Sequence, residues 1–281
     1  MPRGMSVEHT IAFIGAGNMA GALIRGLIST GTVSSDRIIA ADPDEARLRS
    51  LEAELEIGVT GDNAEAVKKA TVVVLATKPQ VLPQVLCGLA TAMRPDTLVI
   101  SIAAGISTGM IERAFPDGSR VVRTMPNTPA LVGAGATAIA AGSHATDDDL
   151  GLAETLFRSV GISVRVPEDQ IDAVTGLSGS GPAYVFAMIE ALRDAGAREG
   201  LPEETALRLA SQTVFGAARL LLDEDEAPEV LRERVTSPGG TTRAGLDALA
   251  AAGFSDAIAG AVRAATRRSL ELGKIAEGTG D

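Results

Sequence analysis

The sequence predicts an α/β protein in which a doubly wound parallel sheet precedes an all-helical region. In the first half, short β-branched runs alternate with helical patterns, and a glycine turn follows the first of these runs. After Pro167 the strand-like runs disappear and only helical patterns remain. Alternating strands and helices are typical of a sheet covered by helices on both faces. We therefore expect one domain over residues 1–166 and a helical domain over residues 167–281.

The expected elements follow from these patterns in order. The strand-like runs are Ile11–Ile14, Ile38–Ala41, Val72–Leu75, Leu98–Ile102, Val121–Thr124, Thr137–Ala141 and Ser163–Val166. The helical patterns between them are Ala20–Ile28, Glu45–Glu54, Glu65–Ala70 and Asp147–Ser159. The helical patterns after the boundary are Glu168–Glu199 with a Gly/Ser/Pro interruption, Pro202–Leu222, Glu229–Arg234, Thr242–Ala252 and Phe254–Leu272.

Composition excludes several classes of protein. At 281 residues the chain is near the length at which one core divides into two domains. Its formal charge of −11 argues against nucleic-acid or anionic-membrane partners, which require a basic surface. A single cysteine, Cys87, excludes an internal disulfide framework and fits a reducing compartment. No uninterrupted apolar stretch is long enough to span a membrane, and Met1–Thr10 lacks the apolar core of a signal peptide. We expect a cytoplasmic protein.

A glycine turn directly after the first strand run predicts a dinucleotide site. Gly15 permits a tight turn, Gly17 lets the backbone approach a pyrophosphate, and Ala20 allows close packing of helix on sheet. In this strand–turn–helix setting the motif indicates a Rossmann-like domain, although glycine turns also serve packing alone. Asp42 follows the second strand run, where a carboxylate would bond a ribose 2′-hydroxyl and favour NADH over NADPH. The alternative role for Asp42 is to cap the next helix.

The segment Val235–Thr242, VTSPGGTT, is a second glycine turn, and it runs into a helical pattern. A turn of this kind presents unpaired backbone N–H groups at a helix N-terminus, which suits a small anion. A nucleotide turn in one domain and an anion turn in the other indicate a cofactor-dependent enzyme acting on a small carboxylate.

Three further segments complete a family pattern: Val74–Pro79 (VLATKP), Met125–Ala130 (MPNTPA) and Thr175–Tyr184 (TGLSGSGPAY). Together with GAGNMA and SPGGTT they resemble the pyrroline-5-carboxylate reductase family, over about Ile11 to Leu272. The resemblance implies NADPH- or NADH-dependent reduction of 1-pyrroline-5-carboxylate to L-proline, the last step of proline biosynthesis. It also implies helical domains that associate as homodimers, with rings of dimers as larger assemblies.

The resemblance assigns roles residue by residue. It places the pyrophosphate on Gly15, Ala16, Gly17, Asn18 and Met19, the adenosine ribose on Asn63, and the nicotinamide ribose on Ala76, Thr77, Lys78, Pro79 and Asn127. It places the substrate carboxylate on Ser237, Gly239, Gly240 and Thr241, and the ring nitrogen on Thr242 as the catalytic hydroxyl. Ser178 is a further candidate for substrate contact, with helix packing as its alternative. Capping of the next helix is the alternative for Thr242. Asp42 departs from the hydroxyl residue that NADPH-preferring members often carry, and no metal ligand is implied.

The inventory of side chains agrees with an imine substrate. A ketone must be protonated as it is reduced, which requires a dedicated acid such as histidine. The only histidines, His9 and His144, lie outside every motif. An imine can arrive already protonated, so positioning and electrostatics suffice.

Two other functions remain open from the sequence. One is a different oxidoreductase of this architecture, either another imine reductase or a β-hydroxyacid dehydrogenase. The latter would need a lysine within Glu168–Glu199, which contains none. The other is a non-catalytic NAD(P)-binding sensor protein, against which the intact SPGGTT turn argues.

Overall fold

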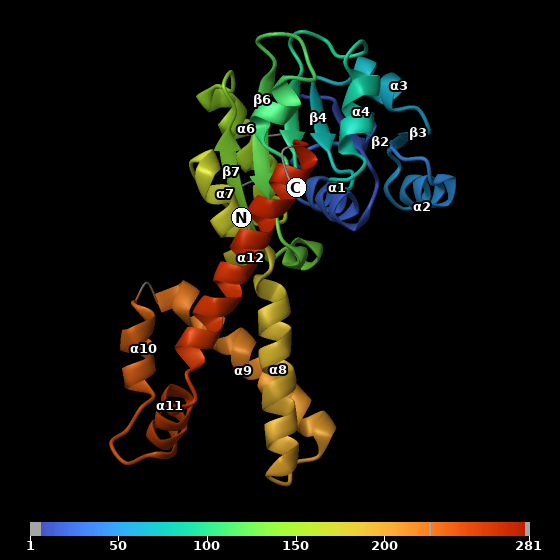
Figure 1. Cartoon of the computed structure of the whole chain (residues 1–281). Helices are drawn as coiled ribbons and strands as arrows, with labels where there is room; N and C mark the ends of the chain where they lie inside the picture. The colour runs from blue at the N-terminus through green and yellow to red at the C-terminus, as the bar shows by residue number, and fades with distance from the viewer. Residues whose placement is uncertain (1–6, 225, 279–281) are drawn as a thin grey trace. The chain divides into compact units, whose positions relative to one another are not determined.

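The computed structural model describes residues 7–224 and 226–278, and these form two compact units (Figure 1). One unit comprises the described residues up to Ser180 together with those from Ala264 onward, and the other is Gly181–Arg263. The compact units therefore divide later than the boundary expected near Val166, and the chain returns to the first unit at its end. The first six residues of Met1–Thr10, the segment expected to lack a signal peptide, lie outside the described residues.

The first unit is built on one eight-stranded sheet with the strand order β3-β2-β1-β4-β5-β6-β7-β8. The strands are β1 (Ile11–Ile14), β2 (Ile38–Ala41), β3 (Gly58–Thr60), β4 (Val72–Leu75), β5 (Leu98–Ser101), β6 (Arg120–Met125), β7 (Gly135–Ala141) and β8 (Gly161–Arg165). All seven expected runs are strands, which confirms the predicted α/β class. Strand β3 was not predicted, because it is a three-residue edge strand without an apolar run.

One pairing differs from the fully parallel sheet that the sequence predicts. Strand β7 runs antiparallel to β6, while β8 runs parallel to β7. A parallel crossover needs a long connection, usually a helix, and only the short 3₁₀ helix Thr128–Val132 links β6 to β7. The chain therefore reverses direction after β6, and β7 pairs with β6 as its antiparallel neighbour.

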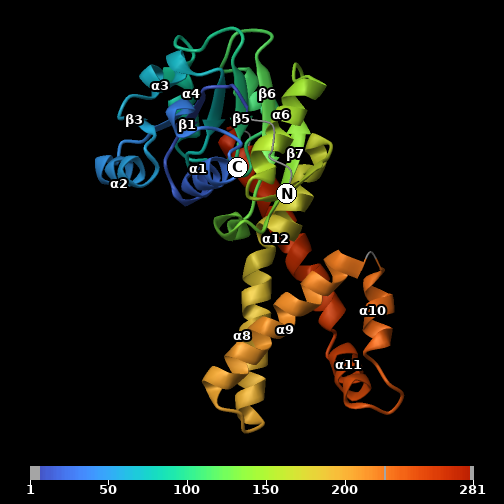
Figure 2. The same cartoon turned by 180° about the vertical axis from the view of Figure 1, so that it is seen from behind.

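The helices of this unit cover both faces of the sheet (Figures 1 and 2). They are α1 (Asn18–Ser29), α2 (Glu45–Leu55), α3 (Asn63–Lys69), α4 (Leu82–Leu89), α5 (Thr108–Glu112), α6 (Asp147–Arg158) and α7 (Ile171–Val174). Alternate residues of each strand point to opposite faces. Ile11 and Phe13 join the core beneath α1, α2 and α6, whereas Ala12 and Ile14 join the core beneath α3, α4 and α5.

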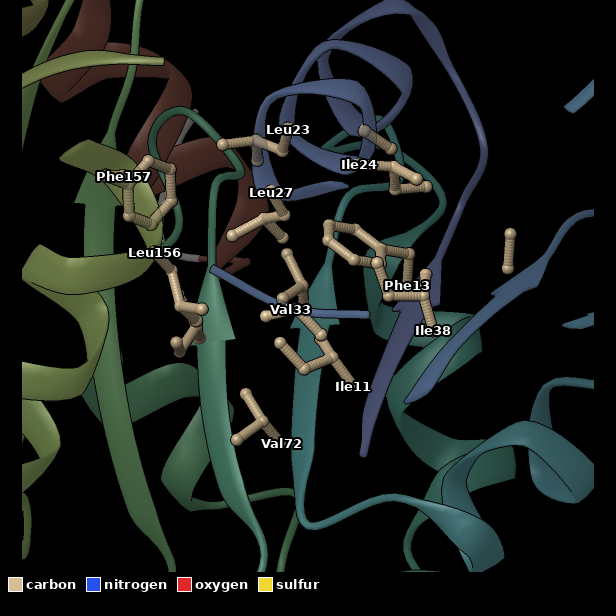
Figure 3. Close-up of a cluster of buried hydrophobic side chains, with 14 of the residues drawn as sticks. Ile11, Phe13, Leu23, Ile24, Leu27, Val33, Ile38, Val72, Leu156 and Phe157 are labelled. Atoms are coloured by element: carbon tan, nitrogen blue, oxygen red, sulfur yellow. The ribbon is translucent and has the colours of Figure 1, made fainter. Parts of the chain in front are cut away.

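Helix α1 is held by an apolar stripe that Figure 3 shows in detail. Its residues Leu23, Ile24 and Leu27 meet Phe13 of β1, and all four are at most 2% exposed. Buried side chains of this size each contribute about 1.5–3 kcal/mol to folding. This packing fixes the start of α1 above the end of β1, where the glycine turn lies.

The second unit is helical, as the sequence predicts. Its helices are α8 (Gly181–Arg198), α9 (Glu203–Glu224), α10 (Pro228–Arg234), α11 (Thr241–Ala251) and the first part of α12 (Phe254–Ala276). Many large apolar side chains of α8 and α9 are exposed in the single chain, among them Phe186, Leu209 and Phe215 at 62%, 55% and 63%. Exposed apolar surface of this extent is typical of a subunit interface. No single helix among the described residues is long and apolar enough to cross a membrane, although α11 and α12, a bent pair, meet that criterion together.

The end of α12 belongs to the first unit. Ser269 Oγ donates a hydrogen bond to Asp172 Oδ1 of α7 at 2.5 Å, and Ser107 Oγ donates one to Glu277 Oε1 at 2.7 Å. Gly273 approaches Gly105 so closely that a Cβ on Gly273 would lie 3.0 Å from the Gly105 carbonyl oxygen. The last helix therefore ends against the loop that follows β5.

Candidate active site

A cavity of the first unit lies at the carboxyl ends of β1, β2 and β4 and has a volume of about 930 Å³. The strand order reverses direction between β1 and β4, and ligands of doubly wound sheets bind at this switch point. The cavity is lined by Gly15, Gly17, Asn18, Ala41, Asp42, Pro43, Arg47, Gly61, Asp62, Asn63, Ala64, Ala76, Thr77, Lys78, Val81, Gln84, Val85, Gly88 and Leu89. The structure thus brings together residues from four of the predicted segments.

The glycine turn forms the floor of this cavity. Gly15 has a φ of +99°, and a Cβ there would lie 2.8 Å from the carbonyl oxygen of Ala76, so only glycine fits. Gly17 is the N-cap of α1 and makes no side-chain capping hydrogen bond. A Cβ on Gly17 would meet nothing within 4 Å. The first N–H groups of α1 therefore open onto space that a phosphate can fill.

The carboxylate of Asp42 holds this turn. Its Oδ2 accepts a hydrogen bond from the Ala16 N–H at 2.8 Å, and its Oδ1 accepts one from the Asp44 N–H at 2.9 Å. The N-cap of α2 is Asp44, whose side chain accepts from Ala46 and Arg47, so the capping alternative for Asp42 is wrong. Asp42 lines the cavity as well, beside Arg47, whose guanidinium lies 3.3 Å from it.

The opposite wall of the cavity comes from the ends of β3 and β4. Asn63 is the first residue of α3, after the N-cap Asp62. Hydrogen bonds from Lys69 and Thr60 lower the pKa of the nearby Glu65 carboxyl, so this acid stays ionised and braces the start of α3. The hydroxyl oxygen of Thr77 is buried and has no hydrogen-bond partner among the described residues. An unsatisfied buried hydroxyl beside open backbone N–H groups fits a polar cofactor.

Some expected cofactor residues lie outside the cavity lining. Ala16, Met19, Pro79 and Asn127 are not among the lining residues, and the N–H of Ala16 is already bonded to Asp42. Sequence reasoning missed Arg47 and the wall contributed by α4. Arg47 is the third residue of the predicted helix Glu45–Glu54, and Asp42 lies before that helix, so helical periodicity does not place the two side by side.

The second predicted turn, Ser237–Thr242, lies in the helical unit. Gly240 is the N-cap of α11 and makes no side-chain capping hydrogen bond, and Gly239 has a φ of +68°. Thr242 is therefore the second residue of α11 rather than its cap, and the capping alternative is wrong. The Ser237, Gly239, Thr241 and Thr242 residues are exposed. The turn offers uncapped N–H groups and free hydroxyls, as an anion site requires.

The side chains of Ser178 and His9 both form hydrogen bonds within the chain. Ser178 Oγ donates to the Val174 carbonyl at 3.2 Å within a π-helical turn, Thr175–Gly179. His9 hydrogen-bonds Thr71 at the amino ends of β1 and β4, whereas the cavity lies at their carboxyl ends. The described residues contain no cluster of side chains that could hold a metal ion.

Family models match both the N-terminal and the C-terminal part of the chain. Residues 168–272 match the family model for pyrroline-5-carboxylate reductase dimerisation, and residues 10–105 match the model for coenzyme F420-dependent NADP oxidoreductases. The chain is 50% identical over 271 residues to the pyrroline-5-carboxylate reductase of Synechocystis sp., covering 96% of this chain and 100% of that protein. It is 47% identical to that of Methanosarcina acetivorans, with coverages of 95% and 99%.

Solved structures give the same result. A pyrroline-5-carboxylate reductase from Coxiella burnetii superposes with a TM-score of 0.90 at 40% identity, covering 95% of this chain and 99% of that one. The pyrroline carboxylate reductase of Plasmodium falciparum, solved with NADP bound, superposes with a TM-score of 0.85 at 30% identity, with coverages of 96% and 100%. The chain is an NAD(P)H-dependent oxidoreductase acting on a C=N bond, and it belongs to the pyrroline-5-carboxylate reductase family.

Proposed function

We propose that this chain reduces 1-pyrroline-5-carboxylate to L-proline with residues of the cavity and of the Ser237–Thr242 turn. The observation that carries the proposal is the uncapped start of α11 behind that turn, because its N–H groups suit the carboxylate of a small imino acid. NADPH or NADH, when bound, supplies the hydride that reduces the imine carbon. The residues of the chain bind and orient the cofactor and the substrate.

Cofactor binding is assigned to the cavity. Gly15, Gly17, Asn18 and Met19 would hold the pyrophosphate through the turn and the start of α1, with Ala16 completing the turn. Asp42 and Asn63 would contact the adenosine ribose, while Ala76, Thr77, Lys78 and Pro79 would contact the nicotinamide ribose. The unsatisfied Thr77 hydroxyl supports this placement.

Substrate binding is assigned to the turn before α11. Backbone N–H groups of Gly239 and Thr241, with the Ser237 hydroxyl, would bind the carboxylate, and the Thr242 hydroxyl would contact the ring nitrogen. The Gly240 N–H donates to the Ser237 carbonyl at 3.1 Å, so Gly240 would serve by closing the turn. The Ser178 hydroxyl donates to the Val174 carbonyl, so it would contact the substrate only as a hydrogen-bond acceptor. A protonated imine loses its positive charge as its carbon accepts hydride, so the residues need to orient the ring rather than donate a proton.

The test is oxidation of NADH and NADPH in the presence of different acceptors. We expect turnover with 1-pyrroline-5-carboxylate and none with pyruvate or other keto acids, because no histidine lines the cavity. Comparable rates with a keto acid would overturn the assignment. Binding of the cofactor without turnover on the imine would contradict the proposed function.

The role of Asp42 in cofactor choice can be tested by Asp42→Ser. Removal of the carboxylate relieves repulsion of a 2′-phosphate, so the NADPH/NADH preference should rise by about three- to tenfold, mainly through KM. The affinity for both cofactors should fall a few-fold as well, because the Ala16 N–H loses its acceptor. Steady-state kinetics with each cofactor measure both effects.

Asp44→Ser is the matched control for this variant. It removes the same charge two residues away, outside the cavity lining, and serine remains a good N-cap for α2. The NADPH/NADH preference of Asp44→Ser should stay near that of the unaltered protein. An unchanged NADPH/NADH preference in Asp42→Ser would mean that Asp42 only holds the glycine turn and does not select the cofactor.

The assembly is proposed as a homodimer formed through the helical region, with a ring of dimers as the larger form. The exposed apolar faces of α8 and α9 support this, since one chain leaves them uncovered. We also propose a cytoplasmic location without nucleic-acid or membrane partners, because the net charge of −11 disfavours both.

A further inference from the structure

The side chain of Asn127 joins three segments of the first unit. It follows β6 and is 9% exposed. Its Oδ1 accepts a hydrogen bond from the Ala136 N–H at 2.8 Å, at the start of β7. Its Nδ2 donates to the Ser178 carbonyl at 3.0 Å, in the π-helical turn Thr175–Gly179. Both ends of the amide are therefore engaged by backbone groups of the chain itself.

The Ser178 carbonyl needs such a donor because of the residue that follows one turn later. In a regular α-helix this carbonyl would accept the N–H of residue 182. Residue 182 is a proline, which has no N–H. The neighbouring bond is also irregular, since the Ser180 N–H donates to the Thr175 carbonyl five residues earlier at 2.8 Å. Asn127 supplies from outside the helix the donor that Pro182 cannot.

A second residue of the same loop holds the same turn. A Cβ on Gly179 would lie 2.6 Å from the terminal methyl carbon of Met125, so that methyl packs directly against the glycine. Met125 and Asn127 thus contact two consecutive residues of the π-helical turn, Gly179 and Ser178. Turns of this kind are rare and concentrate at functional sites.

The turn lies where the chain passes from one compact unit into the other, between Ser180 and Gly181. We infer that Asn127 is a positioning residue that fixes this crossing point, and that it is not a ligand of the cofactor. Its absence from the cavity lining and the engagement of both its Oδ1 and its Nδ2 by backbone groups support this assignment. The expected effect on turnover rests on the proposed function, whereas the effects on structure and on cofactor binding do not.

The test compares Asn127→Ala with Asn63→Ala, which removes an amide that does line the cavity. Three quantities are measured: the Kd for NADH, hydrogen exchange of the amides in residues 175–181, and kcat/KM for the imine. For Asn127→Ala we expect an NADH Kd within about twofold of that of the unaltered protein. Amide exchange in residues 175–181 should be faster and kcat/KM for the imine lower, each by about tenfold or more, which is the range for one lost buried hydrogen bond. For Asn63→Ala we expect a raised Kd with unchanged exchange in the turn.

Pro182→Ala provides a rescue that only the proposed role predicts. It restores an N–H at residue 182, which can donate to the Ser178 carbonyl when Asn127 is absent. The effect of Asn127→Ala on exchange should therefore be several-fold smaller in the Pro182→Ala background. If Asn127→Ala does not fold, Asn127→Asp retains the acceptor for Ala136 and replaces the donor to Ser178 with a carboxylate oxygen that repels its carbonyl.

Two results would overturn the inference. One is a rise of about tenfold in the NADH Kd of Asn127→Ala with unchanged exchange in residues 175–181, which would make Asn127 a cofactor ligand. The other is an equal effect of Asn127→Ala on exchange in the unaltered protein and in Pro182→Ala. That result would show that Asn127 does not act through the Ser178 carbonyl, for which Pro182 provides no donor. An enzyme without turnover on the imine would contradict the proposed function and leave the exchange and binding results to decide the role of Asn127.

Discussion

Gly15→Ala is expected to abolish cofactor binding. The backbone at Gly15 has a φ of +99°, and the added methyl carbon would lie within 3.0 Å of three backbone atoms of Ala76 and Thr77. Those atoms cannot retreat easily, because the Ala76 N–H is bonded to the Ile14 carbonyl at 2.8 Å. The turn must therefore shift. We expect the Kd for NADH to rise by about a hundredfold or more, and the free energy of unfolding to fall by about 1–3 kcal/mol.

Gly17→Ala separates the two effects. Gly17 has a φ of −70°, and a Cβ there would meet no atom of the protein within 4 Å. The folded state should keep its stability while cofactor binding weakens, because the methyl enters the space assigned to the pyrophosphate. Fluorescence titration with NADH and thermal unfolding of both variants measure this. Normal NADH affinity in Gly15→Ala would show that the turn is not the pyrophosphate site.

The sequence predicts the sheet well because its central strands are buried on both faces. Such strands are continuous apolar runs, as in Val72–Leu75, which stand out from the polar helices between them. Strand β3 escapes prediction because an edge strand needs no such run. The reversal at β7 escapes it too, since strand direction depends on the connection and on pairing rather than on the residues of the strand.

The residues of the candidate site also differ in whether the sequence predicts them. Gly15 is predictable because a local backbone requirement selects glycine, and Gly17 is placed at the start of α1 by its spacing from Gly15. Arg47 is not predictable, because its place in the cavity depends on its pairing with Asp42 and Asp44 across the start of α2. Asn127 illustrates a further limit. Its partners, Ala136 and Ser178, are set by the tertiary fold, so a motif alone suggests a ligand where the structure shows a bridge between backbone groups.

Thr242→Val is expected to lower kcat/KM for the imine by about ten- to a thousandfold, the range for losing one positioned polar group at a reacting centre. Valine keeps the shape of the side chain and removes its hydroxyl. Thr242 is exposed and is the second residue of α11, whose N-cap is Gly240. The substitution therefore removes no capping bond, and the melting temperature and NADH affinity should remain near those of the unaltered protein.

Thr213→Val is the control, because Thr213 is an exposed helical threonine of α9 outside the Ser237–Thr242 turn. It makes the same chemical change in the middle of a helix, on an exposed side chain, so its kinetics and melting temperature should both stay near normal. A selective loss of kcat/KM in Thr242→Val then reports the lost hydroxyl rather than the change in helix propensity. Normal kinetics in Thr242→Val would reject its contact with the ring nitrogen, and the orientation of the imine would rest on the backbone of the turn alone.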